Sequence, residues 1–275
     1  MRRNVVAIDG YSGVGSGTIA KAFKSEWLEL GEDIGSIDTG SLYRCIGIEA
    51  YQIGHDPDSI TARQVADIVS GVHFDAELGV FMPHCADEDF EKSEHLIRSP
   101  HADDQSSAFG DSVVTRAAVN TLCNQTVLDN NDKLYVIDGR QEFSRFVGIG
   151  HYPVVGLFVV CDPLARAERR LAQGHNDNTI EEMAEAIESR DEADKSREHE
   201  PIKVYDGSDA YYSTISHSTR GEREILAPEA REQNINNPEG KSVQFIYDTS
   251  FIGPSQYRTL ARFMFDATKN IRSNS

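Results

Sequence analysis

The amino-acid sequence predicts an α/β fold in which a parallel β-sheet is flanked by helices. Three observations support this prediction. Strand-like and helix-like patterns alternate along the 275 residues, two of the strands are apolar throughout, and a glycine-rich turn joins the first strand to the first helix. Strands that are apolar on both faces are typical of parallel sheets covered by helices. The length suits one α/β core that carries insertions.

The first strand, at residues 5–8, leads into the glycine-rich turn, and a helix follows at residues 18–30. Glycine lets successive backbone N–H groups approach phosphate oxygens closely, and the positive end of the helix dipole adds to their attraction. The turn therefore predicts a phosphate loop of the P-loop NTPase type, although a plain tight turn would use glycine equally well. The residues expected to bind the phosphates of a nucleotide are Gly10, Ser12, Gly13, Val14, Gly15, Ser16, Gly17 and Thr18.

After the first helix, the sequence predicts further alternating elements and two insertions. Short strands at 72–75, 80–82 and 96–98 are separated by polar turns, which predicts an antiparallel flap inserted into the core. The stretch at 211–242 is polar and broken by prolines and glycines, which predicts a solvent-exposed insertion. Other strands are expected at 34–38, 134–137, 154–161 and 244–247, and helices at 41–53, 58–70, 180–194 and 254–269. The stretch at 100–128 is expected to be mostly helical, and a further helix is expected to start at Pro163.

The charge balance and the cysteines narrow the range of partners. The formal net charge of −18 argues against binding a nucleic-acid backbone through a broad basic face, so a polyanionic ligand must meet a local cluster of cations. Cys45, Cys85, Cys123 and Cys161 are scattered without metal-ligand spacing, so we expect neither disulfides nor zinc. No signal peptide and no apolar run of membrane-spanning length are visible, which indicates a cytoplasmic protein that does not contact membranes.

Two groups of charged residues lie where a phosphate loop would use them. Asp138 ends the apolar strand at 134–137, where P-loop proteins hold the acid that orients Mg²⁺, although acids also follow strands as helix caps. Arg166, Arg169 and Arg170 have the spacing of one helix face. They predict a clamp for a transferring phosphate, whereas the plainer interpretation is a solvated surface.

A third group lies on the helix predicted at 180–194. Arg190, Asp194 and Arg197 follow one another at about one helical turn, which by itself fits an ordinary ladder of salt bridges. Together with the phosphate loop and the arginine clamp, these residues favour a mononucleotide kinase.

A series of short motifs runs through the chain in a fixed order. They are Ala7-Ile8-Asp9-Gly10 with Ser12-Gly13-Val14-Gly15, Asp38-Thr39-Gly40-Ser41-Leu42-Tyr43-Arg44, Ile97-Arg98-Ser99-Pro100, Asp138-Gly139-Arg140, Arg166-Ala167-Glu168-Arg169-Arg170, Arg190-Asp191 through Arg197, and Asp248-Thr249-Ser250. In these motifs the chain resembles the bacterial cytidylate kinases, the CMP and dCMP kinases of the nucleoside monophosphate kinase superfamily. The resemblance covers nearly the whole chain apart from 211–242.

The resemblance implies a division of the chain and a role for each motif. It implies a nucleotide kinase core at 1–62 and 99–275 with a lid at about 163–200, and a monophosphate-binding insertion at 63–98 that closes on substrate and excludes water. The implied ligands are ATP with Mg²⁺ as donor and CMP or dCMP as acceptor, and we expect a monomer. For CMP, the resemblance implies that Ser107, Arg116 and Arg197 recognise cytosine and that Arg44 and Arg140 bind the acceptor phosphate. It implies that Arg190 and Asp194 contact the sugar and that Thr39 also belongs to the CMP-binding residues. The implied catalytic residues are Arg166, Arg169, Arg170 and Asp138.

Two departures from the family pattern concern the reacting centre. Ser16 replaces the phosphate-loop lysine, and Gln141 stands where the family's Gly-Arg-Asp has its aspartate, followed by bulkier residues at 142–145. Removing one preorganised donor typically lowers the rate by about 10²- to 10³-fold. Three explanations stay open: Lys21 or a lid arginine supplies the missing charge, the protein binds nucleotide without efficient transfer, or Ser16 is an introduced substitution.

Three functions are therefore compatible with the sequence. The first is a cytidylate kinase that transfers the γ-phosphate of ATP, with Mg²⁺, to CMP or dCMP. The second is a catalytically impaired pyrimidine-nucleotide-binding protein with a regulatory role, and the third is a kinase for another small acceptor, since Gln141 alters a polar contact near the phosphate. The intact acceptor motifs favour the first.

Overall fold

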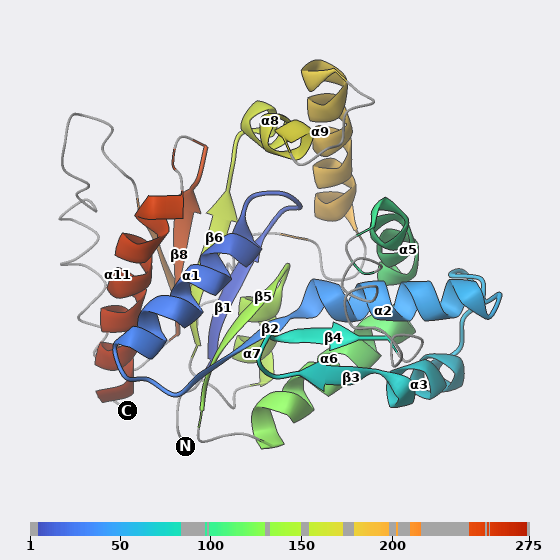
Figure 1. The fold of residues 1–275 in the computed structure, drawn as a ribbon, viewed down its shortest axis with the longest axis horizontal. Helices are drawn as coiled ribbons and strands as arrows, with labels where there is room; N and C mark the ends of the chain where they lie inside the picture. The colour runs from blue at the N-terminus through green and yellow to red at the C-terminus, as the bar shows by residue number, and fades with distance from the viewer. Residues whose placement is uncertain are drawn as a thin grey trace. The chain divides into compact units, whose positions relative to one another are not determined.

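The computed structural model describes residues 5–83, 97, 99–129, 133–149, 154–172, 179–197, 202, 210–215, 242–250, 252 and 254–273 (Figure 1). The chain divides into two compact units. Unit 1 consists of Met1–Ile34 and Asp132–Ser275, and unit 2 consists of Gly35–Asn131.

Unit 1 is built on a parallel sheet, as the sequence predicted. Its strands lie in the order β5-β1-β6-β8-β7, and every adjacent pair is parallel. The strands are β1 (Val5–Gly10), β5 (Leu134–Gly139), β6 (Val154–Val160), β7 (Ala210–Ile215) and β8 (Ser242–Asp248). The central strand β1 is buried along its whole length between β5 and β6, which explains its continuous apolar sequence.

Helices α1 (Ser16–Glu29), α7 (Glu142–Ile149) and α11 (Pro254–Ser273) cover the two faces of this sheet. Helices α8 (Pro163–Ala172) and α9 (Ile180–Ser196) pack against each other. Figure 1 shows α1 and α11 side by side, and Trp27 joins them by donating its indole N–H to the Ala261 carbonyl at 2.7 Å. Val155 and Leu157 of β6 pack in the core that these two helices share, whereas Gly156 between them faces Phe143 of α7. Since neighbouring residues of a strand point to opposite faces, α7 covers the other face.

Unit 2 contains most of β2 (Ile34–Asp38), followed by helices and a small hairpin. Its other elements are α2 (Thr39–Gln52), α3 (Ala62–Gly71), β3 (His73–Asp75), β4 (Val80–Met82), α5 (Pro100–Gly110) and α6 (Val113–Asp129). The strands β3 and β4 pair antiparallel, as expected for the predicted flap. Gly79 has a φ of 71° and stands so close to Ser36 that a side chain there would clash.

The predicted elements agree with the structure except at four places. A capping box of Thr61 and Gln64 starts α3 later than the predicted 58. The strand expected at 96–98 has a helical residue, Ile97, at its centre, while 96 and 98 lie outside the described residues. Residues 210–215 form β7, so the polar stretch at 211–242 begins within a strand, and 216–241 lie outside the described residues. Helix α7 was not predicted at all.

The most apolar segments that the structure describes form strands and helices of the two units. Among the residues that the structure describes, no helix combines the length and the apolar character needed to cross a lipid bilayer.

Candidate active site

The predicted phosphate loop connects β1 to α1 in the backbone conformation that glycine allows. Gly13 and Gly15 have φ angles of 80° and 95°, in the left-handed region that most residues avoid. Gly15 is the N-cap of α1 and has no side chain with which to cap the helix. The N–H groups at such a helix start are those that bind anions. The geometry therefore fits a loop that cradles phosphate.

Ser16 is the first residue of α1, and the nearest lysine along the helix is poorly placed to replace a lysine at position 16. Lys21 is exposed to solvent. Five residues along an α-helix move the side chain about 7.5 Å and turn it through a net angle of about 140°. Lys21 therefore lies on a different face of α1 from Ser16. Any side-chain positive charge on the phosphate loop would therefore have to come from another element.

Helix α8 brings two arginines of the predicted clamp directly onto the loop. Arg166 donates from Nη1 to the Ser12 carbonyl at 3.1 Å, and Arg170 donates from Nη2 to the Ser12 hydroxyl at 2.9 Å. The Nε of Arg170 lies 3.4 Å, and the Cδ of Arg166 4.0 Å, from the point where a Cβ on Gly13 would stand. The structure therefore places positive charge beside the bare backbone of a loop that lacks its lysine.

The third arginine, Arg169, reaches the loop together with Thr249. Its Nη1 lies 3.4 Å from the Thr249 hydroxyl and 3.3 Å from the Cys161 sulfur, and its Nη2 donates to the Thr249 carbonyl. The buried Thr249 hydroxyl in turn donates to the Val14 carbonyl at 2.8 Å. Arg169 Nη1 also lies 3.9 Å from where a Cβ on Gly15 would stand. Thr249, which the sequence marked only as part of a motif, thus links the loop to an arginine of α8.

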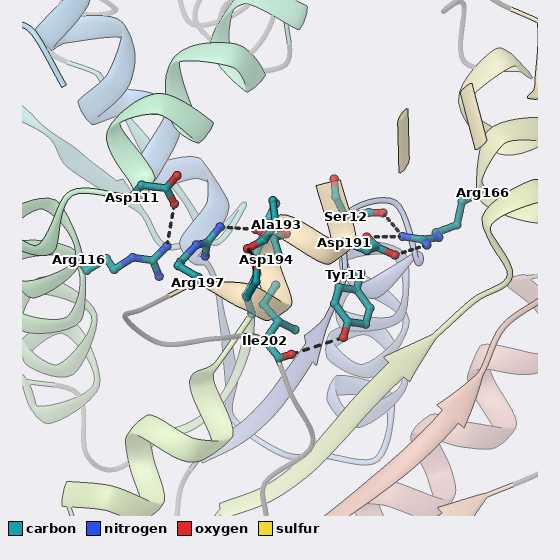
Figure 2. Close-up of polar contacts among 12 residues, drawn as sticks. Tyr11, Ser12, Asp111, Arg116, Arg166, Asp191, Ala193, Asp194, Arg197 and Ile202 are labelled. Atoms are coloured by element: carbon teal, nitrogen blue, oxygen red, sulfur yellow. Dashed lines mark hydrogen bonds and ion pairs between the residues drawn. The ribbon is translucent and has the colours of Figure 1, made fainter. Parts of the chain in front are cut away.

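Arg166 is only 2% exposed, and its charge is matched by Asp191 of α9, which is 7% exposed. Nη1 donates to Oδ1 at 3.0 Å and Nη2 donates to Oδ2, so the pair is bidentate. Figure 2 shows this guanidinium pointing at both Asp191 and Ser12. Bidentate pairs fix the orientation of both partners. No role was predicted for Asp191, although it lies in the motif that runs from Arg190 to Arg197 and is spaced i,i+3 from Asp194 on the same helix face.

Asp138 lies at the end of β5 beside the first turn of α1. Its Oδ2 is 3.1 Å from the point where a Cβ on Gly17 would stand, so a side chain at position 17 would have to displace this carboxylate by a few tenths of an ångström. Mg²⁺ keeps several waters and is usually held by one or two carboxylates plus substrate phosphates. Within the described ranges no group of three or more His, Cys, Asp or Glu side chains converges. A single carboxylate beside a phosphate loop fits a magnesium ion that arrives with its nucleotide.

Asp9 lies immediately before the loop, and its side chain caps the N-terminus of α7. Its carboxylate accepts the backbone N–H groups of Glu142 at 2.7 Å and Phe143 at 2.9 Å. Burial and, after it, the negative charge of Glu142 raise the pKa of Asp9 from 3.8 to about 7, against the effect of the two N–H groups. Glu142 is paired with Arg145 one turn along α7. Asp9, Glu142 and Arg145 therefore form a largely buried charged cluster at the start of α7.

On the acceptor side of unit 1, two of the predicted arginines meet on one carboxylate. Arg140, which follows β5, and Arg197, which ends α9, both pair with Asp194. The Asp194 side chain is 3% exposed, compared with 34% for Arg140 and 17% for Arg197. Arg190 is half-buried on the same helix. The structure thus brings Arg140, Asp194 and Arg197 together, with guanidinium groups that solvent or a ligand can reach.

The four acceptor residues predicted in unit 2 are Thr39, Arg44, Ser107 and Arg116. Thr39 and Arg44 lie on α2, whose N-cap Asp38 accepts the Ser41 N–H and lies 3.8 Å from Arg44 Nη1. Ser107 is exposed on α5, and Arg116 Nη2 on α6 lies 3.7 Å from Asp111. These contacts hold the two arginines beside carboxylates within unit 2.

Two tyrosines beside the loop were missed from the sequence. Tyr257 of α11 places its hydroxyl 3.3 Å from where a Cβ on Gly15 would stand, and burial raises its pKa. Tyr11 lies in the loop itself, and its pKa is raised by burial and then by the negative charges of Asp191 and Asp194. The sequence carried no signal for Tyr257, since it lies on a helix that begins far along the chain.

Comparisons with known proteins agree with this geometry. A family model described as cytidylate kinase matches residues 6–228. The chain is 27% identical over 217 residues to a cytidylate kinase of Fervidobacterium nodosum, an alignment that covers 77% of this chain and 90% of the relative. It is 29% identical over 249 residues to that of Parabacteroides distasonis, covering 86% of this chain and all of the relative. For the cytidylate kinase of Limosilactobacillus reuteri the identity is 29%, over 72% of this chain and 82% of the relative.

Proposed function

Because the chain belongs to the cytidylate kinase family, we propose that it transfers the γ-phosphate of ATP to CMP or dCMP and releases ADP with the nucleoside diphosphate. The observation that carries this proposal is the contact of Arg166 and Arg170 with Ser12 of the phosphate loop. Phosphoryl transfer depends on positioned positive charge more than on covalent chemistry. A loop without lysine can support transfer when fixed guanidinium groups take over that charge.

On the donor side, the backbone N–H groups of the loop and the start of α1 bind the phosphates of ATP. Gly13 and Gly15 keep this surface free of side chains. Arg170, which is half-buried, is the arginine best placed to reach a phosphate, because Arg166 is committed to Asp191. Planar guanidinium groups bind phosphate oxygens in a bidentate manner and remain charged at any physiological pH.

On the acceptor side, Arg140 binds the phosphate of CMP, and Asp194 accepts hydrogen bonds from the sugar hydroxyl groups. Arg197 recognises cytosine, and its pairing with Asp194 fixes its direction before the ligand arrives. Of the other predicted residues, Arg190 is assigned to the sugar, Arg44 to the acceptor phosphate, Ser107 and Arg116 to cytosine, and Thr39 to the same acceptor set.

Asp138 would hold Mg²⁺ beside the phosphate loop. Bound there, the ion would supply positive charge that neutralises part of the charge of the donor phosphates. The protein contributes position and charge: the loop aligns the donor, the arginines of the acceptor group align CMP, and the acceptor oxygen attacks the γ-phosphorus in line without a covalent enzyme intermediate.

A coupled assay of ADP formation with CMP, dCMP and UMP tests this function on the natural protein and on Ser16→Lys side by side. We expect turnover with a cytosine nucleotide, at a rate within about tenfold of the Ser16→Lys variant, because the arginines already supply most of the charge. A calorimetric titration with several monophosphates checks the acceptor. Equal affinity for all of them would contradict the roles given to Ser107 and Arg116.

Ser16 and Gln141 favour a second candidate, a regulatory protein that binds pyrimidine nucleotides without efficient transfer. Both positions depart from the family pattern beside the reacting centre. This candidate predicts a natural protein that binds CMP and ATP but forms no ADP, together with a gain of activity in Ser16→Lys. The same assay therefore separates the two functions.

A further inference from the structure

We propose that Asp191 is a positioning residue that couples acceptor binding to donor binding, by holding Arg166 on the phosphate loop from a helix whose next turn carries the acceptor residues. This inference rests on the proposed function. It assigns to Asp191 a task that no motif in the sequence indicated.

The first step is the chain of contacts from α9 to the loop. Asp191 holds both Nη atoms of Arg166, and Arg166 Nη1 also donates to the Ser12 carbonyl at 3.1 Å. Both side chains are almost fully buried. Water therefore has little access to the pair, and the two groups keep one geometry. Any shift of Asp191 must move the guanidinium that contacts Ser12 (Figure 2).

A second route joins the same helix to the neighbouring loop residue. The Tyr11 hydroxyl donates to the Ile202 carbonyl at 3.4 Å, and the Ile202 N–H donates to the Asp194 carbonyl at 3.0 Å. The ammonium group of Lys195 lies 5.5 Å from the centre of the Tyr11 ring. Tyr11 and Ser12 are thus both connected to α9, through different side chains. Helix α9 therefore supports the phosphate loop at two neighbouring residues.

The third step is the acceptor end of α9. Asp194 lies three residues after Asp191, so the two carboxylates share one face of the helix. Asp194 pairs with Arg140 and Arg197, whose guanidinium groups remain partly exposed. CMP that binds these residues orders this turn of α9, and the ordered helix presents Asp191 and Arg166 to the loop in one position. The ordering cost for the second nucleotide falls, which gives positive coupling.

A purely structural role for Asp191 makes a different prediction. A buried ion pair adds little net stability over an apolar pair of similar volume, while loss of one partner leaves an uncompensated charge. If Asp191 only neutralises Arg166, its removal lowers stability and weakens both nucleotides alike. If it positions Arg166, its removal abolishes the effect of one nucleotide on the other.

The experiment measures calorimetric affinities for adenylyl imidodiphosphate with Mg²⁺, without and with saturating CMP. We expect CMP to tighten binding of this ATP analogue to the natural protein by about fivefold or more. In Asp191→Asn we expect the ratio of the two affinities to fall within about twofold of one, while CMP alone binds within about threefold of its natural affinity. The steady-state signature is a raised KM for ATP that added CMP no longer lowers.

Glu192→Gln is the matched control, because it makes the same chemical change on the same helix at a side chain that is 74% exposed and lies 3.7 Å from the Lys195 ammonium group. It should keep the natural ratio. Asp191→Glu retains the charge but not the spacing, so it is expected to lose coupling even if Asp191→Asn fails to fold. Natural coupling in Asp191→Asn or Asp191→Glu, or equal loss in Glu192→Gln, overturns the proposal.

The same measurements separate this inference from the proposed function. A natural protein that binds neither nucleotide shows that both are wrong. One that binds both nucleotides with a ratio of one overturns the coupling and leaves the proposed function standing.

Discussion

The phosphate loop and the acceptor end of α9 obtain their positive charge in opposite ways. At the acceptor end, Asp194 and Arg197 lie three residues apart on one helix and pair with each other directly. At the loop, Ser12 meets guanidinium groups that lie 154 and 158 positions later in the chain. The pairing of Asp194 with Arg197 is thus a local property of the sequence, whereas the contacts of Ser12 depend on how α8 packs. The pairing of Asp194 with Arg140 depends on how β5 and α9 are brought together.

Removal of Arg170 should have the largest effect on activity of the substitutions considered, because it takes positive charge from the phosphate loop. Arg170→Ala takes away the half-buried guanidinium that donates to the Ser12 hydroxyl, and we expect kcat/KM for ATP to fall by about 10²- to 10³-fold. Steady-state kinetics with CMP at saturation measures this loss. Arg258→Ala is the control, because this arginine is 64% exposed and lies 3.8 Å from Glu29 on α1. A loss below about tenfold in Arg170→Ala would contradict the charge replacement.

Asp9, which lies directly before the phosphate loop, makes the stability of the folded protein depend on pH. Its folded pKa of about 7 lies above the ordinary 3.8, so its contribution to stability is complete below pH 3.8 and is lost as the pH rises through about 7. Asp9→Asn removes this titration. The stability of the variant relative to the natural protein should therefore rise by about 2–4 kcal/mol between pH 4 and pH 7.

Urea unfolding followed by fluorescence measures this change, since Trp27 is buried and is the single tryptophan of the chain. Glu142→Gln provides a second check. The negative charge of Glu142 raises the pKa of Asp9, so its removal should narrow the pH range over which stability is lost. Parallel stability curves for Asp9→Asn and the natural protein would show that the carboxyl does not titrate in this range.

On the acceptor side, Arg140→Ala should act on one substrate only. Arg140 pairs with Asp194 and is assigned to the acceptor phosphate. Loss of a charged hydrogen bond predicts a rise in the KM for CMP of about 10- to 100-fold, with the KM for ATP within about threefold. Varying each substrate at saturation of the other measures both values. An equal rise in the KM for CMP and the KM for ATP would contradict the assignment of Arg140 to the acceptor alone.

The smallest expected effect concerns the support of the loop. Thr249→Val removes the hydroxyl that donates to the Val14 carbonyl at 2.8 Å. We expect a loss of about 1 kcal/mol in the free energy of unfolding and a rise of a few-fold in the KM for ATP. Thr121→Val is the matched control, since the Thr121 hydroxyl donates to the Ala117 carbonyl on an exposed helix surface. Equal changes in both variants would show that the Thr249 hydroxyl has no special role in supporting the phosphate loop.

Several features of the site could be predicted because they depend on residues close together in the sequence. The loop glycines, the shared face of Arg166 and Arg170, and the helix that carries Asp194 all follow from local spacing. Helix α7 could not be predicted in the same way. Its first N–H groups are capped by Asp9, which lies 133 positions earlier on a neighbouring strand. A helix that takes its cap from another element carries no start signal of its own.

By itself, the sequence determined the parallel α/β plan, the bare phosphate loop, and the charged residues on α8 and α9. Only the tertiary structure decided that the arginines of α8 meet Ser12, that Asp191 holds Arg166, and that Asp9 begins α7. The physical reason is the distance along the sequence over which each interaction acts. Periodicity and turn chemistry act between residues a few positions apart, whereas the pairing of buried charges depends on which elements the sheet brings side by side.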